Sequence, residues 1–259
     1  MGLALITGAS SGIGLELAKL FAQHGYDLVI AADDDDIHAA ATTLSSSGVD
    51  VQPVQVDLRN PKDVEKLYEQ TTAGGRHPDA AALNAGVGQG GSFVDSDLDD
   101  NLSIVDLNVR STVHLAKLLL PDMVRRNTGK VLFTSSIAST MAGPYQSVYH
   151  ASKSFIQSLA EALQDELRDT AVTVTSLMPG PTDTNFFRRA ELGNTLLGRM
   201  PKDDPAEVAK QGFEALMRGK RKVLAESVTT KVMGAANKFL PDSVKAAAAR
   251  VINVPVDHR

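Results

Sequence analysis

Short apolar segments alternate along this chain with longer segments in which apolar residues recur every three to four positions. Segments of the first kind predict buried strands over residues 3–7, 27–32, 51–56, 80–83, 131–134 and 172–177. Segments of the second kind predict helices: one that ends at His24-Gly25, one over 37–47, one that starts at Asn60-Pro61, and two long ones over 102–126 and 148–168. Because the strands are continuously apolar and alternate with helices, the pattern predicts an α/β fold, a doubly wound parallel sheet with helices on both faces.

The chain changes character after residue 179. Residues 183–200 and 205–218 show irregular helical patterns, 222–225 predicts an edge strand, and 229–253 predicts two helices broken at Pro241. We interpret 1–259 as a single domain, with 183–200 covering the substrate and 227–259 forming a helical C-terminal extension. The basic residues of that extension allow a membrane-surface helix, but an amphipathic helix packed on the body is the favoured interpretation; they are Lys231, Lys238, Lys245 and Arg250.

Composition narrows the possible classes of protein. A chain of 259 residues, 43% apolar and 22% charged, is long enough to bury one large core. It has no cysteine, which excludes disulfide scaffolds, thiolate metal sites and cysteine nucleophiles. The formal net charge of −5 argues against a nucleic-acid-binding protein. Without a targeting signal or an 18-residue apolar run, we expect a cytoplasmic protein with no metal and no membrane contact.

A glycine cluster follows the first predicted strand directly. Gly8, Gly12 and Gly14 lie in the segment TGASSGIG, which opens the first predicted helix. In this position glycines allow a sharp turn and a close approach of the backbone to a pyrophosphate, while the helix N-terminus presents N–H groups to the anion. A tight turn without a ligand is the alternative, but the strand–turn–helix context favours dinucleotide binding.

Asp33 stands at the end of the second strand, 19 residues after Gly14. A carboxylate there can accept hydrogen bonds from the adenosine ribose, which favours NAD over NADP. Asp34, Asp35 and Asp36 follow it, either as solvated loop and helix-capping residues or as further charges that repel a 2′-phosphate. Because residues 7–14 contain no Arg or Lys to offset this repulsion, we favour NAD and keep NADP as the alternative.

Three polar residues are candidates for acid–base chemistry. Tyr149 and Lys153 are spaced i, i+4 near the start of a long helix, and Ser136 closes the fifth strand 13 residues before Tyr149. The ammonium of Lys153 and a bound nicotinamide cation would favour the phenolate of Tyr149, and Ser136 can hydrogen-bond a substrate oxygen. His150 points about 100° away from its neighbour on a helix, so we expect it to lie at the periphery.

These motifs together resemble the short-chain dehydrogenase/reductase family. The resemblance rests on TGASSGIG at 7–14, Asn84-Ala85-Gly86, Asn108, Ser136, the Tyr149/Lys153 pair and Pro179-Gly180, and covers residues 1 to about 220. It implies a Rossmann-type sheet of seven strands in the order 3-2-1-4-5-6-7. It also implies hydride exchange between nicotinamide and a carbonyl or alcohol carbon.

The resemblance also implies roles for individual residues. Tyr149 would be the general acid/base, Lys153 would hold the nicotinamide ribose and lower the pKa of Tyr149, Ser136 would polarise the substrate oxygen, and Asn108 would place a water that links Lys153 to solvent. Asp57 would contact the adenine amine and Thr184 the carboxamide. The remaining cofactor-binding positions implied are Gly8, Ser10, Ser11, Gly12, Ile13, Gly14, Asp33, Leu58, Asn84, Ala85, Gly86, Tyr149, Lys153, Pro179, Gly180 and Thr182.

Two departures from the family pattern bear on the assembly and the cofactor. Many relatives that use NADP carry Arg at the place of Ser11 or just after the second strand, where this chain has Asp33, and this difference agrees with NAD here. Many relatives also end in a strand and a glycine-rich tail that completes a tetramer, whereas this chain has the helical extension, so we expect a homodimer rather than a tetramer.

The apolar residues of 183–200 predict a hydrophobic small-molecule ketone or secondary alcohol as substrate; they are Phe186, Phe187, Leu192, Leu196 and Leu197. Arg188 and Arg189 are either solvated or meet a substrate carboxylate. The competing hypothesis is a non-catalytic dinucleotide sensor that signals through a partner protein. The retained Tyr149, Lys153, Ser136 and Asn108 count against it.

Overall fold

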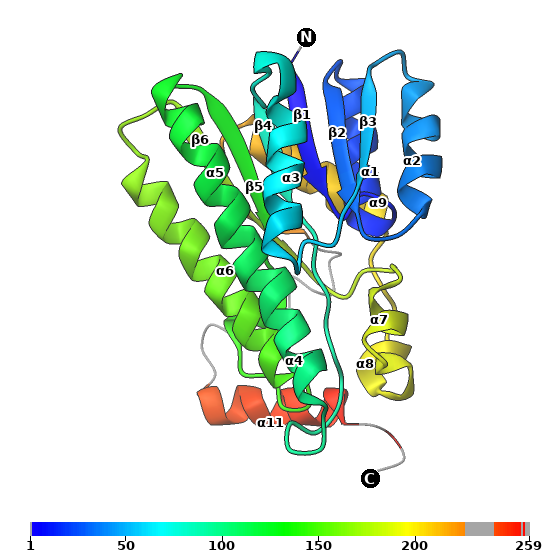
Figure 1. The fold of residues 1–259 in the computed structure, drawn as a ribbon. Helices are drawn as coiled ribbons and strands as arrows, with labels where there is room; N and C mark the ends of the chain where they lie inside the picture. The colour runs from blue at the N-terminus through cyan, green and yellow to red at the C-terminus, as the bar shows by residue number, and fades with distance from the viewer. Residues whose placement is uncertain (1, 226–240, 255, 257–259) are drawn as a thin grey trace.

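The computed structural model describes residues 2–225, 241–254 and 256, and a seven-stranded parallel sheet forms its centre (Figure 1). The strand order is β3-β2-β1-β4-β5-β6-β7, which confirms the predicted topology. The strands are β1 (Leu3–Thr7), β2 (Asp27–Ala32), β3 (Val51–Gln55), β4 (Ala80–Leu83), β5 (Gly129–Thr134), β6 (Val172–Pro179) and β7 (Lys222–Ala225). All adjacent pairs are parallel, so the carboxyl ends of the strands meet at one edge of the sheet.

Helices cover both faces of this sheet. On one face lie α1 (Gly12–Gln23), α2 (Asp36–Ser45) and α9 (Pro205–Met217), and on the other lie α3 (Pro61–Thr72), α5 (Ser111–Arg125) and α6 (Ser147–Glu166). The shorter elements are η1 (Ala73–Gly75), α4 (Leu98–Ile104), η2 (Val105–Arg110), η3 (Ile137–Thr140), α7 (Phe186–Arg189), η4 (Leu192–Asn194), α8 (Leu196–Arg199) and α11 (Asp242–Asn253).

Two hydrophobic cores follow from the alternation of side chains along each strand. Ala4 and Ile6 of β1 pack into the core beneath α1, α2 and α9, while Leu3 and Leu5 pack into the core beneath α3, α5 and α6. Every residue of β1 is buried. Burial on both faces explains why the strand sequences are continuously apolar.

The helix predicted over 102–126 has a different form in the structure. It begins earlier, at Leu98, and a π-helical turn, η2, interrupts it before α5 continues. An inserted π turn shifts the side chains that follow it around the helix axis and is common at functional sites. The turn contains Asn108, which is buried.

The C-terminal helix α11 begins directly after Pro241 and lies across the end of the molecule that also carries α4 and the start of α6 (Figure 1). Its residue Asn253 is buried; its Oδ1 accepts from Gln146 Nε2 at 2.9 Å, and its Nδ2 donates to Pro144 O at 3.1 Å. This part of the extension therefore packs on the body. The first of the two helices predicted over 229–253 lies outside the described residues. No helix in the described part of the chain is both long and apolar enough to cross a membrane.

Candidate active site

A single cavity of about 640 Å³ runs along the carboxyl edge of the sheet. Nearly all the predicted site residues line it: Gly8, Ser10, Ser11, Gly12, Ile13, Asp33, Asp57, Leu58, Asn84, Ala85, Gly86, Ser136, Tyr149, Lys153, Pro179, Gly180, Thr182 and Thr184. Gly14 and Asn108 are not among the residues that line the cavity. The cavity falls in the volume range typical of small-molecule and cofactor sites.

The glycine loop has the close packing that the sequence predicts. Gly8 and Gly12 adopt positive φ angles of 68° and 56°, which disfavour other residues. A Cβ atom on Gly14 would lie 2.0 Å from the carbonyl oxygen of Gly8, so α1 packs directly against the loop. The side chain of Ser11, the N-cap residue of α1, makes no capping hydrogen bond, which leaves the first N–H groups of the helix available to an anion. The loop therefore fits the pyrophosphate of a dinucleotide.

Two asparagines connect the strands and helices around the cavity. Asn84 donates from Nδ2 to Thr7 O at 3.2 Å and accepts at Oδ1 from Thr134 Oγ1 at 3.1 Å, which links β1 to β5 across the end of β4. Asn108 accepts at Oδ1 from Val87 N at 2.9 Å and donates from Nδ2 to Val87 O at 2.8 Å. These bonds hold the segment after β4 in the shape that lines the cavity.

Tyr149, Ser136 and Lys153 converge on the middle of the cavity. The Ser136 side chain hydrogen-bonds the Tyr149 hydroxyl, and Lys153 Nζ lies 5.8 Å from the centroid of the Tyr149 ring. Lys153 Nζ donates to Thr134 O at 2.9 Å. An ideal Cβ on Gly86 would lie 3.2 Å from Lys153 Nζ and 3.1 Å from Asn108 Oδ1, so glycine leaves the space between these groups open. The hydroxyl of Tyr149 and the ammonium of Lys153 thus face the same part of the cavity.

Burial shifts the pKa values of both Tyr149 and Lys153. Burial raises the pKa of Tyr149 to about 12, and the Ser136 hydrogen bond offsets this only in part. Burial also lowers the pKa of Lys153 to about 8. The ammonium of Lys153 donates to the Thr134 carbonyl. Desolvation of the Tyr149 phenol is the largest cause of the shift in the pKa of Tyr149. In this arrangement Tyr149 keeps its proton at neutral pH, and the lowering of its pKa by Lys153 and a bound nicotinamide remains a prediction.

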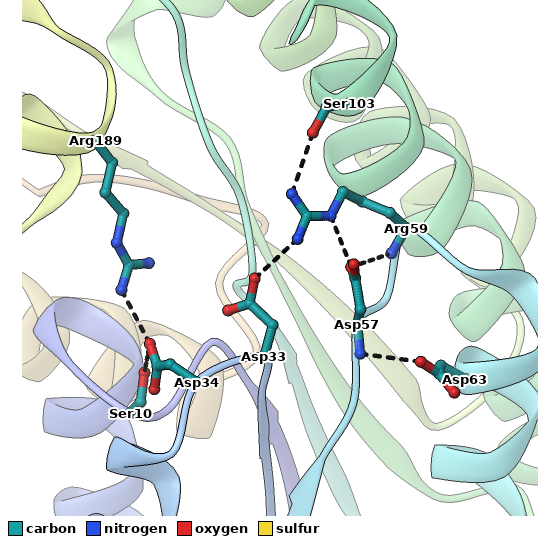
Figure 2. Close-up of polar contacts among 8 residues, drawn as sticks. All are labelled: Ser10, Asp33, Asp34, Asp57, Arg59, Asp63, Ser103 and Arg189. Atoms are coloured by element: carbon teal, nitrogen blue, oxygen red, sulfur yellow. Dashed lines mark hydrogen bonds and ion pairs between the residues drawn. The ribbon is translucent and has the colours of Figure 1, made fainter. Parts of the chain in front are cut away.

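An arginine that the sequence reasoning missed lies at the adenosine end of the cavity. Arg59 donates from Nη2 to Asp33 Oδ2 at 3.1 Å and from Nε to Asp57 Oδ1 at 2.7 Å (Figure 2). Burial by itself would raise the pKa of Asp57, but the hydrogen bonds and the charge of Arg59 outweigh it and lower that pKa. Arg59 follows the third strand, outside the glycine loop in which the sequence showed no basic residue.

A second arginine reaches the acidic residues after β2 from the opposite side. Arg189 of α7 donates from Nη2 to Asp34 Oδ2 at 3.0 Å, and the same oxygen accepts from Ser10 Oγ at 3.1 Å (Figure 2). Asp35 Oδ1 accepts from Gln55 Nε2 at 2.7 Å. Residues 7–14 supply no cation, as the sequence shows, but Arg59 and Arg189 from distant parts of the chain pair with these carboxylates. In this structure Arg189 pairs with the carboxylate of Asp34.

The other end of the cavity is largely apolar and draws on α7, α8 and α11. Phe186, Phe187, Leu197, Met200 and Ile252 line it. The ring of Phe186 lies 5.1 Å from the ring of Tyr149, centroid to centroid.

His150 also lines the cavity, contrary to its predicted peripheral position. Its Nδ1 lies 3.0 Å from Met141 O, and burial lowers the pKa of its imidazole. The helical-wheel prediction for His150 was wrong because the loop that carries Met141 folds over the start of α6.

Comparison with known proteins gives a consistent result. The family model described as "short chain dehydrogenase" matches residues 2–194. The oxidoreductase UcpA of Salmonella typhimurium is 29% identical over 214 residues, 82% of this chain and 79% of that protein. Dehydrogenase/reductase SDR family member 7B of Rattus norvegicus is 30% identical over 237 residues, 85% of this chain and 72% of that protein.

Two solved structures share the fold. A short-chain dehydrogenase from Sphingobium yanoikuyae in complex with NADPH has a TM-score of 0.80 at 27% identity and covers 92% of this chain and 94% of its own. A short-chain dehydrogenase/reductase from Burkholderia phymatum in complex with NAD has a TM-score of 0.83 at 26% identity and covers 92% of each chain.

Proposed function

The chain belongs to the short-chain dehydrogenase/reductase family of NAD(P)-dependent oxidoreductases, and from this membership we propose that it interconverts a hydrophobic ketone and its secondary alcohol. The dinucleotide, when bound, supplies or accepts the hydride at its nicotinamide ring. The observation that carries the proposal is the convergence of Tyr149, Ser136 and Lys153 on one dinucleotide-sized cavity.

Tyr149 is the proposed general acid/base. With a pKa of about 12 it holds its proton at neutral pH, so it suits donation to a carbonyl oxygen in the reduction direction. Ser136, which bonds the same hydroxyl, would orient and polarise that oxygen. Lys153 and Asn108 would support the cofactor side, Lys153 through the nicotinamide ribose and Asn108 through the segment at Val87 that it holds in place.

NAD is the proposed preferred cofactor, with NADP as the second. Asp33 lines the cavity, and its side chain is 44% exposed, so its carboxylate can reach a ribose hydroxyl. Asp57 would contact the adenine and Thr184 the carboxamide. The ion pairs with Arg59 and Arg189 reduce the repulsion that four adjacent carboxylates would impose on a 2′-phosphate.

Residues 183–200 and α11 are proposed to form the substrate end of this single domain. The aromatic side chains of Phe186 and Phe187 and the apolar face of α11 line the cavity beside Tyr149. Large apolar surfaces of this kind favour a hydrophobic substrate.

The experiment combines cofactor titration with a substrate screen. NADH and NADPH are titrated by fluorescence, and a panel of ketones and alcohols is then screened with wild type and with Tyr149→Phe, which removes the hydroxyl and keeps the ring. We expect turnover to fall by at least 100-fold in Tyr149→Phe while cofactor affinity changes little.

A matched control is Tyr68→Phe on α3, outside the cavity lining, which should retain full turnover. Wild-type turnover in Tyr149→Phe would remove Tyr149 from the acid/base role. Tight cofactor binding by the wild type with no turnover across the panel would instead favour the sensor hypothesis.

A homodimer through α5 and α6 is also proposed. Exposed apolar side chains lie along this face: Leu98, Leu102, Val105 and Val113 on α4 to α5, and Phe155 on α6. Sedimentation equilibrium of wild type and Val113→Glu tests it. A monomeric wild type would contradict the proposal.

A further inference from the structure

The cavity is bridged near its adenosine end by an ion pair between residues 155 positions apart. Arg189, the last residue of α7, contacts Asp34 in the loop after β2, and Asp34 also accepts from Ser10 in the glycine loop. Arg189 lines the cavity itself. Figure 2 shows the Arg189 side chain extending from α7 to the Asp34 and Ser10 pair. The contact therefore joins the segment over the substrate to two loops on the cofactor side.

The other end of α7 contacts the reacting group. Phe186, its first residue, packs its ring 5.1 Å from the ring of Tyr149 and against Gly88, where a Cβ would lie 2.6 Å from Phe186 Cζ. A helix of four residues is only about one turn long. Arg189 and Phe186 therefore stand at the two ends of one helical turn, which connects the ion pair to the wall beside Tyr149.

The same segment lies directly against the glycine loop. A Cβ on Gly12 would lie 2.9 Å from Thr184 Cγ2. Ser10, Ser11 and Gly12 and the residues that lead into α7 line the same cavity and meet at this contact.

The ion pair has the strength expected of a contact that opens and closes. The side chains of Arg189 and Asp34 are 45% and 30% exposed, and pairs of this exposure stabilise only weakly. Asp34 Oδ1 is buried and has no hydrogen-bond partner, so only one oxygen of the carboxylate is satisfied when the segment is closed.

We propose that Arg189 is a positioning residue for the bound dinucleotide: its ion pair with Asp34 holds α7 closed over the cofactor, and breaking the pair is a step in cofactor release. The inference rests on the proposed function only in that this cavity is the dinucleotide site. Arg189 acts through Asp34, and no contact with substrate is required of it.

The test is the rate of NADH release, measured by stopped-flow displacement with excess NAD⁺ and followed by NADH fluorescence. Arg189→Met and Asp34→Asn should each release NADH roughly three- to fivefold faster than wild type, and the double variant should be no faster than either single variant. Asp34→Asn keeps an oxygen that can accept from Ser10. Arg188→Met is the matched control, because Arg188 makes its hydrogen bond to Asn185 outside the ion pair, and it should leave the rate unchanged.

Charge reversal distinguishes the loss of the ion pair from a general loss of structure. Arg189→Glu and Asp34→Lys should each accelerate release, and the two together should restore a rate near that of the wild type. Additive acceleration in the reversed pair, or equal effects of Arg188→Met and Arg189→Met, would overturn the proposal. Faster release in Arg189→Met with no effect of Asp34→Asn would also overturn it, since Arg189 would then act on the cofactor directly. A wild type that binds neither NADH nor NADPH would contradict the proposed function and is distinct from all these outcomes.

Discussion

Arg59 is the residue at which a single substitution should change the ratio of the affinities for NADH and NADPH. In Arg59→Met the cation that pairs with both Asp33 and Asp57 is removed, while the aliphatic part of the side chain is kept. Arg59 itself is outside the lining of the cavity. Any effect on the cofactor must therefore pass through charge or through the two carboxylates.

The magnitude follows from the geometry. The Arg59 guanidinium is 3.1 Å from Asp33 Oδ2, and a hydroxyl that donates to Asp33 adds about 2.8 Å, so the ribose 2′ position lies about 6 Å from the cation. The two side chains are 38% and 44% exposed, so a dielectric constant near that of water applies, and one unit charge at about 6 Å contributes about 0.7 kcal/mol. A phosphate with a charge near −2 doubles this to about 1.4 kcal/mol, or about tenfold in Kd. NADH has no charge at that position.

Fluorescence titrations of both cofactors at low and high salt measure the effect. We expect Arg59→Met to raise the Kd of NADPH fivefold to tenfold and that of NADH by less than about threefold, with the difference shrinking in 0.5 M NaCl. Arg59→Lys, which keeps the charge, should resemble wild type in this ratio. Equal changes for the two cofactors, or tighter NADPH binding in Arg59→Met, would refute the electrostatic account.

Three further predictions concern the packing and titration of the site. Gly14→Ala places a Cβ against the carbonyl oxygen of Gly8, which cannot move without disturbing the glycine loop, and should lower the free energy of unfolding by about 3 kcal/mol in urea titrations; an unchanged midpoint would contradict the packing. The pKa of Lys153 is lowered to about 8, so its ammonium is lost as pH rises through that value, and NADH affinity should fall above about pH 8 if the charged form holds the ribose; flat affinity from pH 7 to 9.5 would exclude that role. Asn253→Ala leaves the Gln146 amide and a backbone carbonyl without partners, and should cost about 1–3 kcal/mol and raise the substrate KM by loosening α11; unchanged protease resistance of α11 would argue otherwise.

The sequence predicted the sheet well because a buried parallel strand has little freedom in composition. The segments 3–7, 27–32, 80–83 and 222–225 coincide with β1, β2, β4 and β7. The π turn at Val105–Arg110 could not be predicted, because one inserted residue shifts the phase of the apolar pattern but leaves its period the same on either side.

The predicted site residues also gather at one cavity, since motifs at the carboxyl ends of parallel strands converge by topology. Arg59 and Arg189 were not predicted. Their roles depend on contacts between loops that are far apart in the chain, and neither lies in a recognisable motif. The raised pKa of Tyr149 could not be predicted, because it comes from burial, which the sequence does not reveal.

The lining of the cavity, which extends from Gly8 to Asn253, ties the stability of the whole protein to its cofactor. The proposed dinucleotide-binding residues extend from Gly8 to Thr184, so binding is possible only after these distant segments have assembled. A dinucleotide present at 100 times its Kd would therefore stabilise the folded state by about 2.7 kcal/mol. The lifetime of this enzyme against unfolding and proteolysis should thus follow the concentration of the nicotinamide pool around it.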